Sequence, residues 1–590
     1  MNLLEKNIQA LLSGVNEPLG NKLLNFIQNK TCSRFNIDEN LNIYDKTHNV
    51  FMYENLEEEL NFFYQGILEK TPRYPFICIY GIGNALLIKN LAKHYKHLFV
   101  FESEIELFIL ALSTIDLSEE LKVYKVVLFD CVAKDLEIQI AMIFDQQSIL
   151  EYLSLYEMFI SSHYYLKYYE TSILSLNELC IKSASVAIRN ADITCFLPLL
   201  THGQFLQNIP SMLESIPFQR ILSQRKNKFE NAIVVSAGPS LTKQLPLLKA
   251  CQDKAVIFCA DGALSMLEKE GIVPDYVTNL DFTDLAMKFF QNKENKTSLN
   301  ILSCATHPNV AHSLKAENCM IVLRNKALYQ RFNFNDFGYI DTGTHVSHFS
   351  YTLALALGFK NIIMIGQDLA FDEEGNSHSK GFDFGEKFSG EENIDKLKIP
   401  AYAGKGEVLT HTTWNDYRIK LEYLFACNDQ KAKFYNATEG GARINFTEEL
   451  SFKECCEKLL TKEKPKFELP KSLTKNRSDK LLVKFKEKIQ KDQENAKRFL
   501  DDALALKQIL ENILSKDFIL PLEFLEKVYQ NIENFNHSLD EDEFIQDEVL
   551  RGAFAYRGKM IADVLKLHIK DETHFITAYI KAYHEWLLYF

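Results

Sequence analysis

The sequence lacks the features that mark several common classes of protein. Its twelve cysteines include no C-x-x-C pair, and only Cys455 and Cys456 are adjacent, so neither a zinc nor a disulfide framework is predicted. No uninterrupted apolar run approaches the length of a membrane span. The segment from Met1 to Lys6 lacks the basic start and the apolar run of a signal peptide. These absences predict a reduced, cytoplasmic protein without a transmembrane segment.

An excess of positive charge is also missing. The 66 basic residues are outnumbered by 79 acidic ones, which gives a formal net charge of −13. Broad nucleic-acid binding needs a basic surface, so we expect no nucleic-acid partner. An apolar content of 47% and a charged content of 25% are those of a globular protein. A chain of 590 residues is too long for one hydrophobic core, and roughly two to four domains are expected.

Short apolar runs that alternate with helical stretches predict an α/β fold. Near the N-terminus the runs are residues 76–80, 98–101 and 126–130, and residues 140–215 have a helical pattern. Further runs in the middle third predict the strands of a doubly wound sheet. These runs are residues 232–236, 255–260, 275–280, 299–304, 319–323 and 361–365, with 432–436 as a candidate seventh.

The C-terminal part has a different pattern. A charged linker with two prolines covers residues 462–470, and apolar residues at helical spacing follow it. We therefore expect a chain of three parts. They are an N-terminal Rossmann-like domain with a helical extension (1–215), a central doubly wound domain (216–465) and a C-terminal helical domain (466–590).

A glycine turn follows the first predicted strand of the N-terminal part. Gly81 and Gly83 lie between a strand and a helix, and Glu102 ends the next strand. This arrangement resembles half of a dinucleotide or adenosylmethionine site, in which the acid binds ribose hydroxyls. The full G-x-G-x-x-G pattern is not met, because position 86 is Leu. The alternative is a structural domain that keeps only the tight turn, and we favour it.

The central part contains a sharper turn. The strand at 232–236 is followed by Gly238, Pro239 and Ser240, which offer close backbone approach, a fixed turn and a hydroxyl near a helix start. Together they can hold an anionic group, although the G-x-x-x-x-G-K-[ST] pattern of a P-loop is absent. Alone, the turn is equally consistent with a capped helix.

Two aspartates strengthen the prediction of a site. Asp261 and Asp281 each follow a predicted strand, so both lie at the carboxyl edge of the sheet, where ligands bind in open α/β folds. Carboxylates at that edge bind sugar hydroxyls or a metal ion. Each one singly is also consistent with a solvated loop residue.

These residues resemble a known family. The segments AGPSL at 237–241, DGAL at 261–264, GQDLAF at 366–371 with His378, and NATEGGA at 436–442 look like those of the motility-associated factor (Maf) flagellin glycosyltransferases. The resemblance implies transfer of a nonulosonic acid (pseudaminic or legionaminic acid) from its CMP-activated form to Ser or Thr of flagellin, before export. The central fold is then similar to that of bacterial sialyltransferases.

The resemblance also implies roles for single residues. His378 would be the general base, and Asp368 would orient it, bind sugar hydroxyls or simply cap the turn. The residues expected to hold the donor are Gly238, Pro239, Ser240, Asp261, Asn279, Asp281, Thr306, Gly343, Thr344, Gly366 and Gln367. Glu439 and Gly440 are expected to contact the acceptor or close the pocket. A loop histidine is also often merely solvated, so position alone does not settle the role of His378.

Metal dependence and two rival functions stay open at this point. The D-x-D motif of metal-dependent sugar transferases is absent, so no cofactor is expected to be required, although a divalent cation is allowed. One rival is a pterin-type pyrophosphokinase, which needs ATP and Mg²⁺ with carboxylates such as Asp261 and Asp281 as ligands. The other is a flagellin-binding assembly factor without catalysis.

Overall fold

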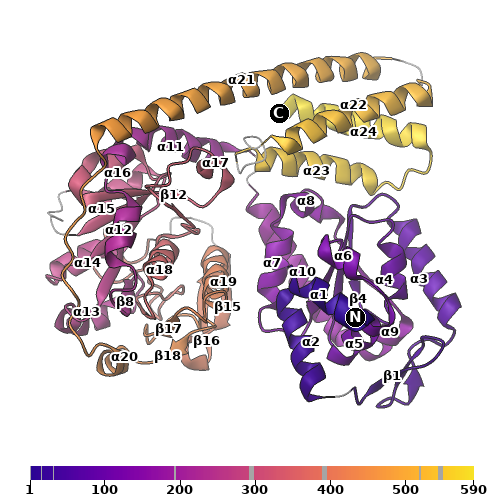
Figure 1. Ribbon diagram of the computed structural model, residues 1–590, viewed down its shortest axis with the longest axis horizontal. Coiled ribbons are helices and arrows are strands. Elements are labelled where there is room, and N and C mark those ends of the chain that lie inside the picture. Colours follow the sequence, from indigo (N-terminus) through magenta and orange to yellow (C-terminus); the bar gives the residue numbers. More distant parts are fainter. Residues whose placement is uncertain are drawn as a thin grey trace. The chain divides into compact units, whose positions relative to one another are not determined.

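The chain divides into two compact units (Figure 1). The computed structural model describes residues 2–14, 16–30, 32–191, 194–291, 298–388, 395–516, 520–542 and 549–589. The first unit comprises Met1–Cys195, Phe499–Leu539 and Leu550–Phe590, and the second comprises Phe196–Arg498 and Asp540–Val549. The predicted three-part layout is not confirmed, because residues 196–215 belong with the second unit and the C-terminal helices are shared between the units.

The first unit contains a parallel sheet in the order β6-β5-β4-β7. Strands β4 (Phe76–Tyr80), β5 (His97–Glu102) and β6 (Val126–Asp130) match the predicted runs. Strand β7 (Met158–Ile160) interrupts the stretch predicted to be helical, and corrects that prediction. Three residues are too few for periodicity to distinguish a strand from a helix.

Helices and a small antiparallel sheet, β1-β2-β3, complete the first unit. Before residue 195 these elements are α1 (Leu3–Leu12), α2 (Glu17–Asn29), β1 (Phe35–Ile37), β2 (Ile43–Asp45), β3 (Val50–Phe51), α3 (Leu56–Lys70), α4 (Leu86–Leu91), α5 (Ile105–Thr114), α6 (Ser118–Lys122), α7 (Leu136–Phe144), α8 (Gln147–Leu150), α9 (His163–Tyr168) and α10 (Glu170–Arg189). The C-terminal helices of the unit are the end of α21 (Lys475–Leu514) from Phe499 onward, α22 (Leu522–Glu541), α23 (Arg551–Leu565) and α24 (Glu572–Tyr589).

The second unit is built on a nine-stranded sheet in which every described pairing is parallel. In spatial order the strands are β13 (Tyr339–Ile340), β12 (Cys319–Arg324), β11 (Leu299–Ser303), β10 (Tyr276–Asn279), β9 (Val256–Ala260), β8 (Asn231–Val235), β14 (Asn361–Ile365), β17 (Lys433–Asn436) and β18 (Glu448–Glu449). All seven predicted runs are strands, which confirms the α/β class. The two edge strands are two residues long and were not predicted.

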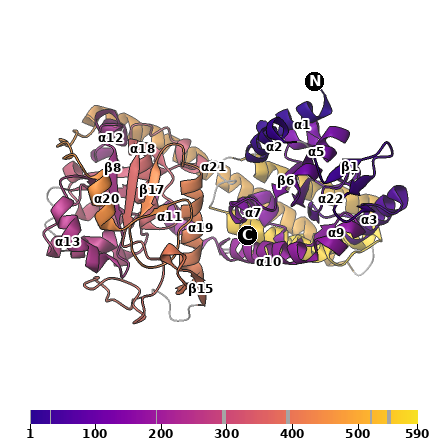
Figure 2. The ribbon, with the colours of Figure 1, turned by 90° about the horizontal axis from the view of Figure 1, so that it is seen from below.

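Alternate residues of the central strands pack on opposite faces of this sheet. Ala232 and Val234 face one apolar layer, which includes residues of α12, α18 and α19, whereas Ile233 and Val235 face a second layer with α13, α14 and α20. Figure 2 shows β8 and β17 with α20 on one side and α19 on the other. Burial on both faces explains why the strands are continuous apolar runs in the sequence.

The helices of the second unit connect these strands, and a hairpin, β15 (Lys396–Pro400) with β16 (Glu407–His411), precedes α19. The helices are α11 (Phe196–Glu214), α12 (Phe218–Arg225), α13 (Leu241–Cys251), α14 (Leu264–Lys269), α15 (Met287–Phe290), α16 (Pro308–Ser313), α17 (Ala327–Gln330), α18 (Val346–Leu357), α19 (Thr412–Ala426), α20 (Phe452–Leu459) and the start of α21 (Lys475–Leu514). No helix within the described residues combines the length and apolar content that crossing a membrane requires.

Candidate functional site

A cavity of about 260 Å³ lies at the carboxyl edge of the nine-stranded sheet. Strand β8 is hydrogen-bonded to β9 on one side and to β14 on the other, so the direction of winding reverses between β8 and β14. Such a switch point is where open α/β sheets bind ligands. The cavity is lined by Ser236, Ala237, Gly238, Ala260, Asp261, Gly262, Asp281, Phe289, His345, Val346, Ser347, Gly366, Gln367, Asp368, Leu369, Ala370, Ser377, His378, Phe382, Trp414 and Tyr417.

The glycine turn after β8 packs tightly against the turn after β14. The backbone N–H of Gly238 donates to the Gly366 carbonyl at 2.8 Å. A Cβ at position 238 would lie 2.5 Å from that carbonyl oxygen and 2.2 Å from Oδ2 of Asp368. Only glycine therefore fits at position 238, as the predicted close approach of backbone requires.

Asp368 joins the two turns through its carboxylate. Oδ2 of Asp368 accepts hydrogen bonds from the backbone N–H of Ser240 at 3.1 Å and from its hydroxyl at 2.8 Å. No hydrogen bond connects Asp368 with His378 among the described residues. Of the roles predicted for Asp368, turn capping is the one that these contacts match. Pro239 is part of the same turn but does not line the cavity.

Burial gives Asp368 a testable titration. The side chain is 4% exposed, and burial raises the pKa of its carboxyl from 3.8 to about 6, against the opposing hydrogen bonds from Ser240. The folded state thus holds this proton at a higher pH than the unfolded state does. The protonated Asp368 carboxyl therefore contributes to the free energy of unfolding. This contribution of roughly 3 kcal/mol is fully present below about pH 4 and is lost as the pH rises to about 6.

We therefore expect Asp368→Asn to flatten the pH dependence of stability between pH 4 and 6, since Asn still accepts from Ser240 but does not titrate. Denaturant unfolding of the wild type and the variant at pH 4, 5, 6 and 7 gives the two profiles. Parallel profiles would show that Asp368 does not titrate in this range.

Three of the predicted polar residues lie at or after the carboxyl ends of β9, β10 and β11. Asp261 is 4% exposed, and its oxygens accept from the backbone N–H of Gly262 at 2.7 Å and from Nδ2 of Asn279 at 2.5 Å. The hydroxyl of Thr306 donates to the Asn279 carbonyl at 3.2 Å. Asn279 thus holds the Asp261 carboxylate in place, and Thr306 in turn holds Asn279. Neither Asn279 nor Thr306 lines the cavity.

Asp281 reaches the cavity directly. It is half-buried, and its Oδ1 accepts from the backbone N–H and the hydroxyl of Thr283 at 2.8 and 2.9 Å. These bonds fix the carboxylate at the cavity wall. Carboxylates held in this way can accept hydrogen bonds from the hydroxyl groups of a bound sugar.

His378 lies in the cavity wall with its ring on Phe382. The ring centroids are 3.9 Å apart and the planes differ by 6°, so the imidazole is stacked. Nδ1 contacts the Ser377 hydroxyl at 2.9 Å, and that hydroxyl also contacts the carbonyls of Glu386 and Phe388 at 2.9 and 2.6 Å. A hydroxyl has one proton and a carbonyl can only accept. Ser377 therefore donates to a carbonyl and accepts from the Nδ1–H of His378.

This tautomer leaves Nε2 of His378 as an acceptor. Burial lowers the pKa of His378 to about 4, with hydrogen bonding to the Phe388 backbone acting in the opposite direction. The ring is thus neutral at neutral pH, with a lone pair on Nε2. A neutral imidazole with an unprotonated Nε2 can take a proton from a hydroxyl group.

Gly343 and Thr344, which are expected to hold the donor, precede helix α18. Helix α18 starts at Val346, and His345 is its N-cap. Gly343 has a φ of +62° and donates from its backbone N–H to Oδ1 of Asp341 at 2.9 Å. Thr344 is exposed and does not line the cavity. Thr344 is thus separated from the first helical residue by the cap, and its expected contact with the donor has no counterpart in the cavity lining.

Glu439 and Gly440 lie behind the glycine turn. The Glu439 carbonyl accepts from Nζ of Lys243 at 2.7 Å, and its carboxylate accepts from the backbone N–H of Phe452 at 2.8 Å. Neither residue lines the cavity. Glu439 thus contacts helices α13 and α20, which pack next to the site, and does not contact the cavity.

Aromatic side chains form one wall of the cavity and were not predicted from the sequence. Trp414 and Tyr417 come from the first turns of α19, and Phe289 and Phe382 complete the wall. The rings of Trp414 and His411 are in tilted contact, with centroids 4.1 Å apart and an angle of 38° between their planes. One signal was available: the chain has two tryptophans, and Trp414 is followed at helical spacing by Tyr417, after a segment rich in polar residues. His345 and Ser347 also line the cavity without having been assigned to the site.

In the first unit, the glycine turn that resembled a dinucleotide site is filled by tyrosines. A Cβ at Gly81 would lie 2.2 Å from the ring of Tyr165, and a Cβ at Gly83 would lie 2.2 Å from the hydroxyl of Tyr53. The Tyr165 hydroxyl donates to Oε2 of the buried Glu102 at 2.6 Å. The space of a cofactor is thus occupied, in agreement with the structural alternative.

We expect Gly81→Ala to destabilise the first unit by about 1–3 kcal/mol, because the methyl group meets Tyr165 and the backbone has a φ of +93°. Ligand binding by the second unit should not change. Gly66→Ala is a matched control, since nothing lies within 4 Å of its Cβ and alanine favours helix α3. Denaturant unfolding compares the two variants, and equal stability would contradict the packing described.

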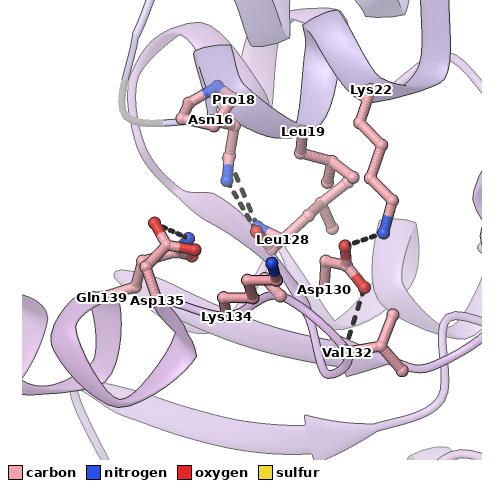
Figure 3. A pocket seen from close by; sticks show the side chains of 11 residues that line it. Asn16, Pro18, Leu19, Lys22, Leu128, Asp130, Val132, Lys134, Asp135 and Gln139 are labelled. Carbon is pink, nitrogen blue, oxygen red and sulfur yellow. Dashed lines mark hydrogen bonds and ion pairs between the residues drawn. The ribbon is translucent and has the colours of Figure 1, made fainter. Parts of the chain in front are cut away.

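A second cavity, of about 310 Å³, lies in the first unit between α2 and the carboxyl end of β6 (Figure 3). Asn16 donates from Nδ2 to the Leu128 carbonyl at 2.6 Å and accepts from its N–H at 3.3 Å. Lys22 forms an ion pair with Asp130. These polar groups already have protein partners, so we assign no ligand to this cavity.

Comparisons with known proteins agree with the α/β fold. A family model described as 6-hydroxymethylpterin diphosphokinase MptE-like matches residues 203–374. Among solved structures, the chain is similar to a MAf glycosyltransferase from Magnetospirillum magneticum AMB-1, with 16% identity and a TM-score of 0.50, over 99% of this chain and 96% of that one. Curated proteins give no match. The predicted resemblance to Maf proteins is thus confirmed at the level of the fold.

Proposed function

We propose that the protein is a glycosyltransferase that moves a nonulosonic acid, pseudaminic or legionaminic acid, from its CMP-activated form to Ser or Thr hydroxyls of flagellin. The observation that carries this proposal is the position of His378, which lines the switch-point cavity with Nε2 left as an acceptor. The next residue, Ser379, donates from its hydroxyl to the Gly238 carbonyl at 2.6 Å, which places the histidine beside the glycine turn. The likeness of fold to a MAf glycosyltransferase supports it. The reaction takes place in the cytoplasm, before flagellin is exported.

The chemistry follows from the residues of the cavity. The acceptor hydroxyl oxygen attacks the anomeric carbon of the sugar, and Nε2 of His378 takes the hydroxyl proton. The bond between the anomeric carbon and the phosphate oxygen breaks, and CMP leaves with its electron pair. The anionic donor raises the pKa of His378 above its value in the free protein, because a nearby negative charge favours the imidazolium form. The reaction needs no cofactor, although it allows a divalent cation.

The other polar groups of the cavity bind and orient the donor in this proposal. The backbone around Gly238 and Gly366 approaches the phosphate or the sugar, and Asp261 and Asp281 accept from sugar hydroxyls. Donors aimed at the departing phosphate stabilise the charge that develops in the transition state, which is often the largest catalytic contribution.

The rival pyrophosphokinase function has support from the family model over residues 203–374. It needs Mg²⁺ at carboxylates such as Asp261 and Asp281. Both oxygens of Asp261 accept hydrogen bonds within the protein, and Oδ1 of Asp281 accepts two. Carboxylates engaged in this way suit the binding of hydroxyls better than the coordination of Mg²⁺, which favours the glycosyltransferase.

Isothermal titration of the purified chain separates the two functions. The proposal predicts that CMP binds without added metal and that a pterin alcohol with ATP and Mg²⁺ neither binds nor reacts. Binding of ATP that depends on Mg²⁺, with formation of AMP and a pterin diphosphate, would replace the proposal by the kinase function.

A further inference from the structure

The cavity has an unusual balance of charge for an anionic ligand. Among the described residues that line it, three are aspartates and none is Lys or Arg. Two lysines of neighbouring helices are engaged elsewhere, Lys243 with the Glu439 carbonyl at 2.7 Å and Lys420 with Asp416 at 2.8 Å. An anionic group in this cavity must therefore be held by neutral hydrogen-bond donors.

His345 lines the cavity, and one N–H group of its ring has no partner among the described residues. Its Nδ1 accepts from the backbone N–H of His348 at 3.3 Å, as the cap of helix α18. A backbone N–H can only donate, so Nδ1 is unprotonated and the ring proton lies on Nε2. That atom is buried and has no hydrogen-bond partner among the described residues, although the residue as a whole is partly exposed.

An unsatisfied buried donor is costly, typically by about 1–3 kcal/mol. Burial lowers the pKa of His345 well below its ordinary value, with the neighbouring His348 acting in the same direction, so the ring stays neutral. A neutral imidazole keeps this single N–H aligned. The uncompensated donor therefore points to a ligand group that accepts a hydrogen bond.

The surroundings of His345 favour an anionic acceptor. The ring lies against Tyr417, with centroids 4.8 Å apart, which holds it at the wall. Val346 and Ser347, the first residues of the 12-residue helix α18, line the same wall. The first N–H groups of a helix and its dipole favour negative charge at this end.

We propose that the Nε2–H of His345 donates a hydrogen bond to an anionic oxygen of the sugar nucleotide, either of its phosphate or of its sugar carboxylate. His345 is thus a positioning residue that takes the role of the Lys or Arg side chain that the described cavity lining lacks. It binds the anionic group that Thr344 was expected to bind. This inference rests on the proposed function, because it names how the same cavity holds its donor.

The test is isothermal titration of full-length wild type, His345→Ala and His345→Gln with CMP, a free nonulosonic acid, cytidine and inorganic phosphate. We expect His345→Ala to weaken CMP or the free acid about 10- to 100-fold, as for the loss of a hydrogen bond to a charged group, and to leave cytidine within about twofold. His345→Gln keeps a side-chain N–H donor and should recover most of the affinity. Loss for CMP assigns the phosphate, and loss for the free acid assigns the carboxylate.

His307→Ala is the matched control. Nδ1 of His307 caps helix α16 by accepting from the backbone N–H of Asn309 at 3.3 Å, but His307 does not line the cavity. This variant should bind every ligand as the wild type does. Equal affinities of wild type and His345→Ala for each anion, or an equal loss for cytidine and CMP, would overturn the inference. If wild type binds inorganic phosphate but not CMP, and His345→Ala weakens phosphate, the anion site stands and the CMP-dependent function fails.

Discussion

His378→Ala should lower the rate of sugar transfer to flagellin by about 10²- to 10⁴-fold, the usual contribution of a general base. The acceptor hydroxyl then has no group at the cavity wall to take its proton. Donor affinity should change little, because His378 is not among the proposed contacts of the donor. The measurement is the initial rate of mass gain of flagellin, together with CMP affinity, for wild type and variant.

The exposed His312 of α16 provides a control in the same unit, and His312→Ala should react at the wild-type rate. Ser377→Ala tests the tautomer, since it removes the oxygen that accepts from Nδ1 of His378. We expect an intermediate loss of rate with unchanged donor affinity. Wild-type rates for His378→Ala would remove this residue from the mechanism. A wild type that binds flagellin without modifying it would support the assembly-factor alternative.

Gly238→Ala should lower the affinity for CMP by about 100-fold, because displacement of a positioned group by about 1 Å has effects of this size. The added methyl group would lie 2.5 Å from the Gly366 carbonyl oxygen, which is backbone and cannot rotate away. The turns after β8 and β14 must then separate. We also expect a loss of stability of about 1–3 kcal/mol from overpacking.

Gly440→Ala is a suitable control for this variant. The nearest atom to its Cβ, Oδ1 of Asp368, lies at 3.7 Å, and the remaining contacts are ordinary as well. This variant should bind CMP and unfold as the wild type does. Titration with CMP and denaturant unfolding of both variants supply the comparison, and an affinity of Gly238→Ala equal to that of Gly440→Ala would show that the turn does not contact the donor.

The strands of the second unit were predictable because they are buried on both faces. Runs such as 232–236 and 361–365 have no polar interruption, and the structure places strands within one residue of them. The carboxyl ends of parallel strands meet at one edge, so Gly238, Asp261 and Asp368 were correctly expected to lie together. The order of the strands and the two short edge strands, β13 and β18, needed the structure.

Other parts of the site depend on contacts that local sequence does not encode. Trp414 and Tyr417 line the cavity from a helix that follows a separate hairpin. They do not follow a strand of the parallel sheet, so their place in the sequence does not indicate that they belong to the site. The ring of Tyr165 fills the glycine turn at Gly81 from more than eighty residues further along the chain. In both cases a distant element decides what a local motif can do.

Intact-mass spectrometry of purified flagellin, incubated with this protein and a CMP-activated nonulosonic acid, tests the central claim most directly. The account predicts that flagellin gains whole multiples of the nonulosonic acid residue mass, with one CMP released per sugar, and that His378→Ala largely abolishes both. Unchanged flagellin with wild-type protein, under conditions in which the donor is intact and CMP binds, would contradict it.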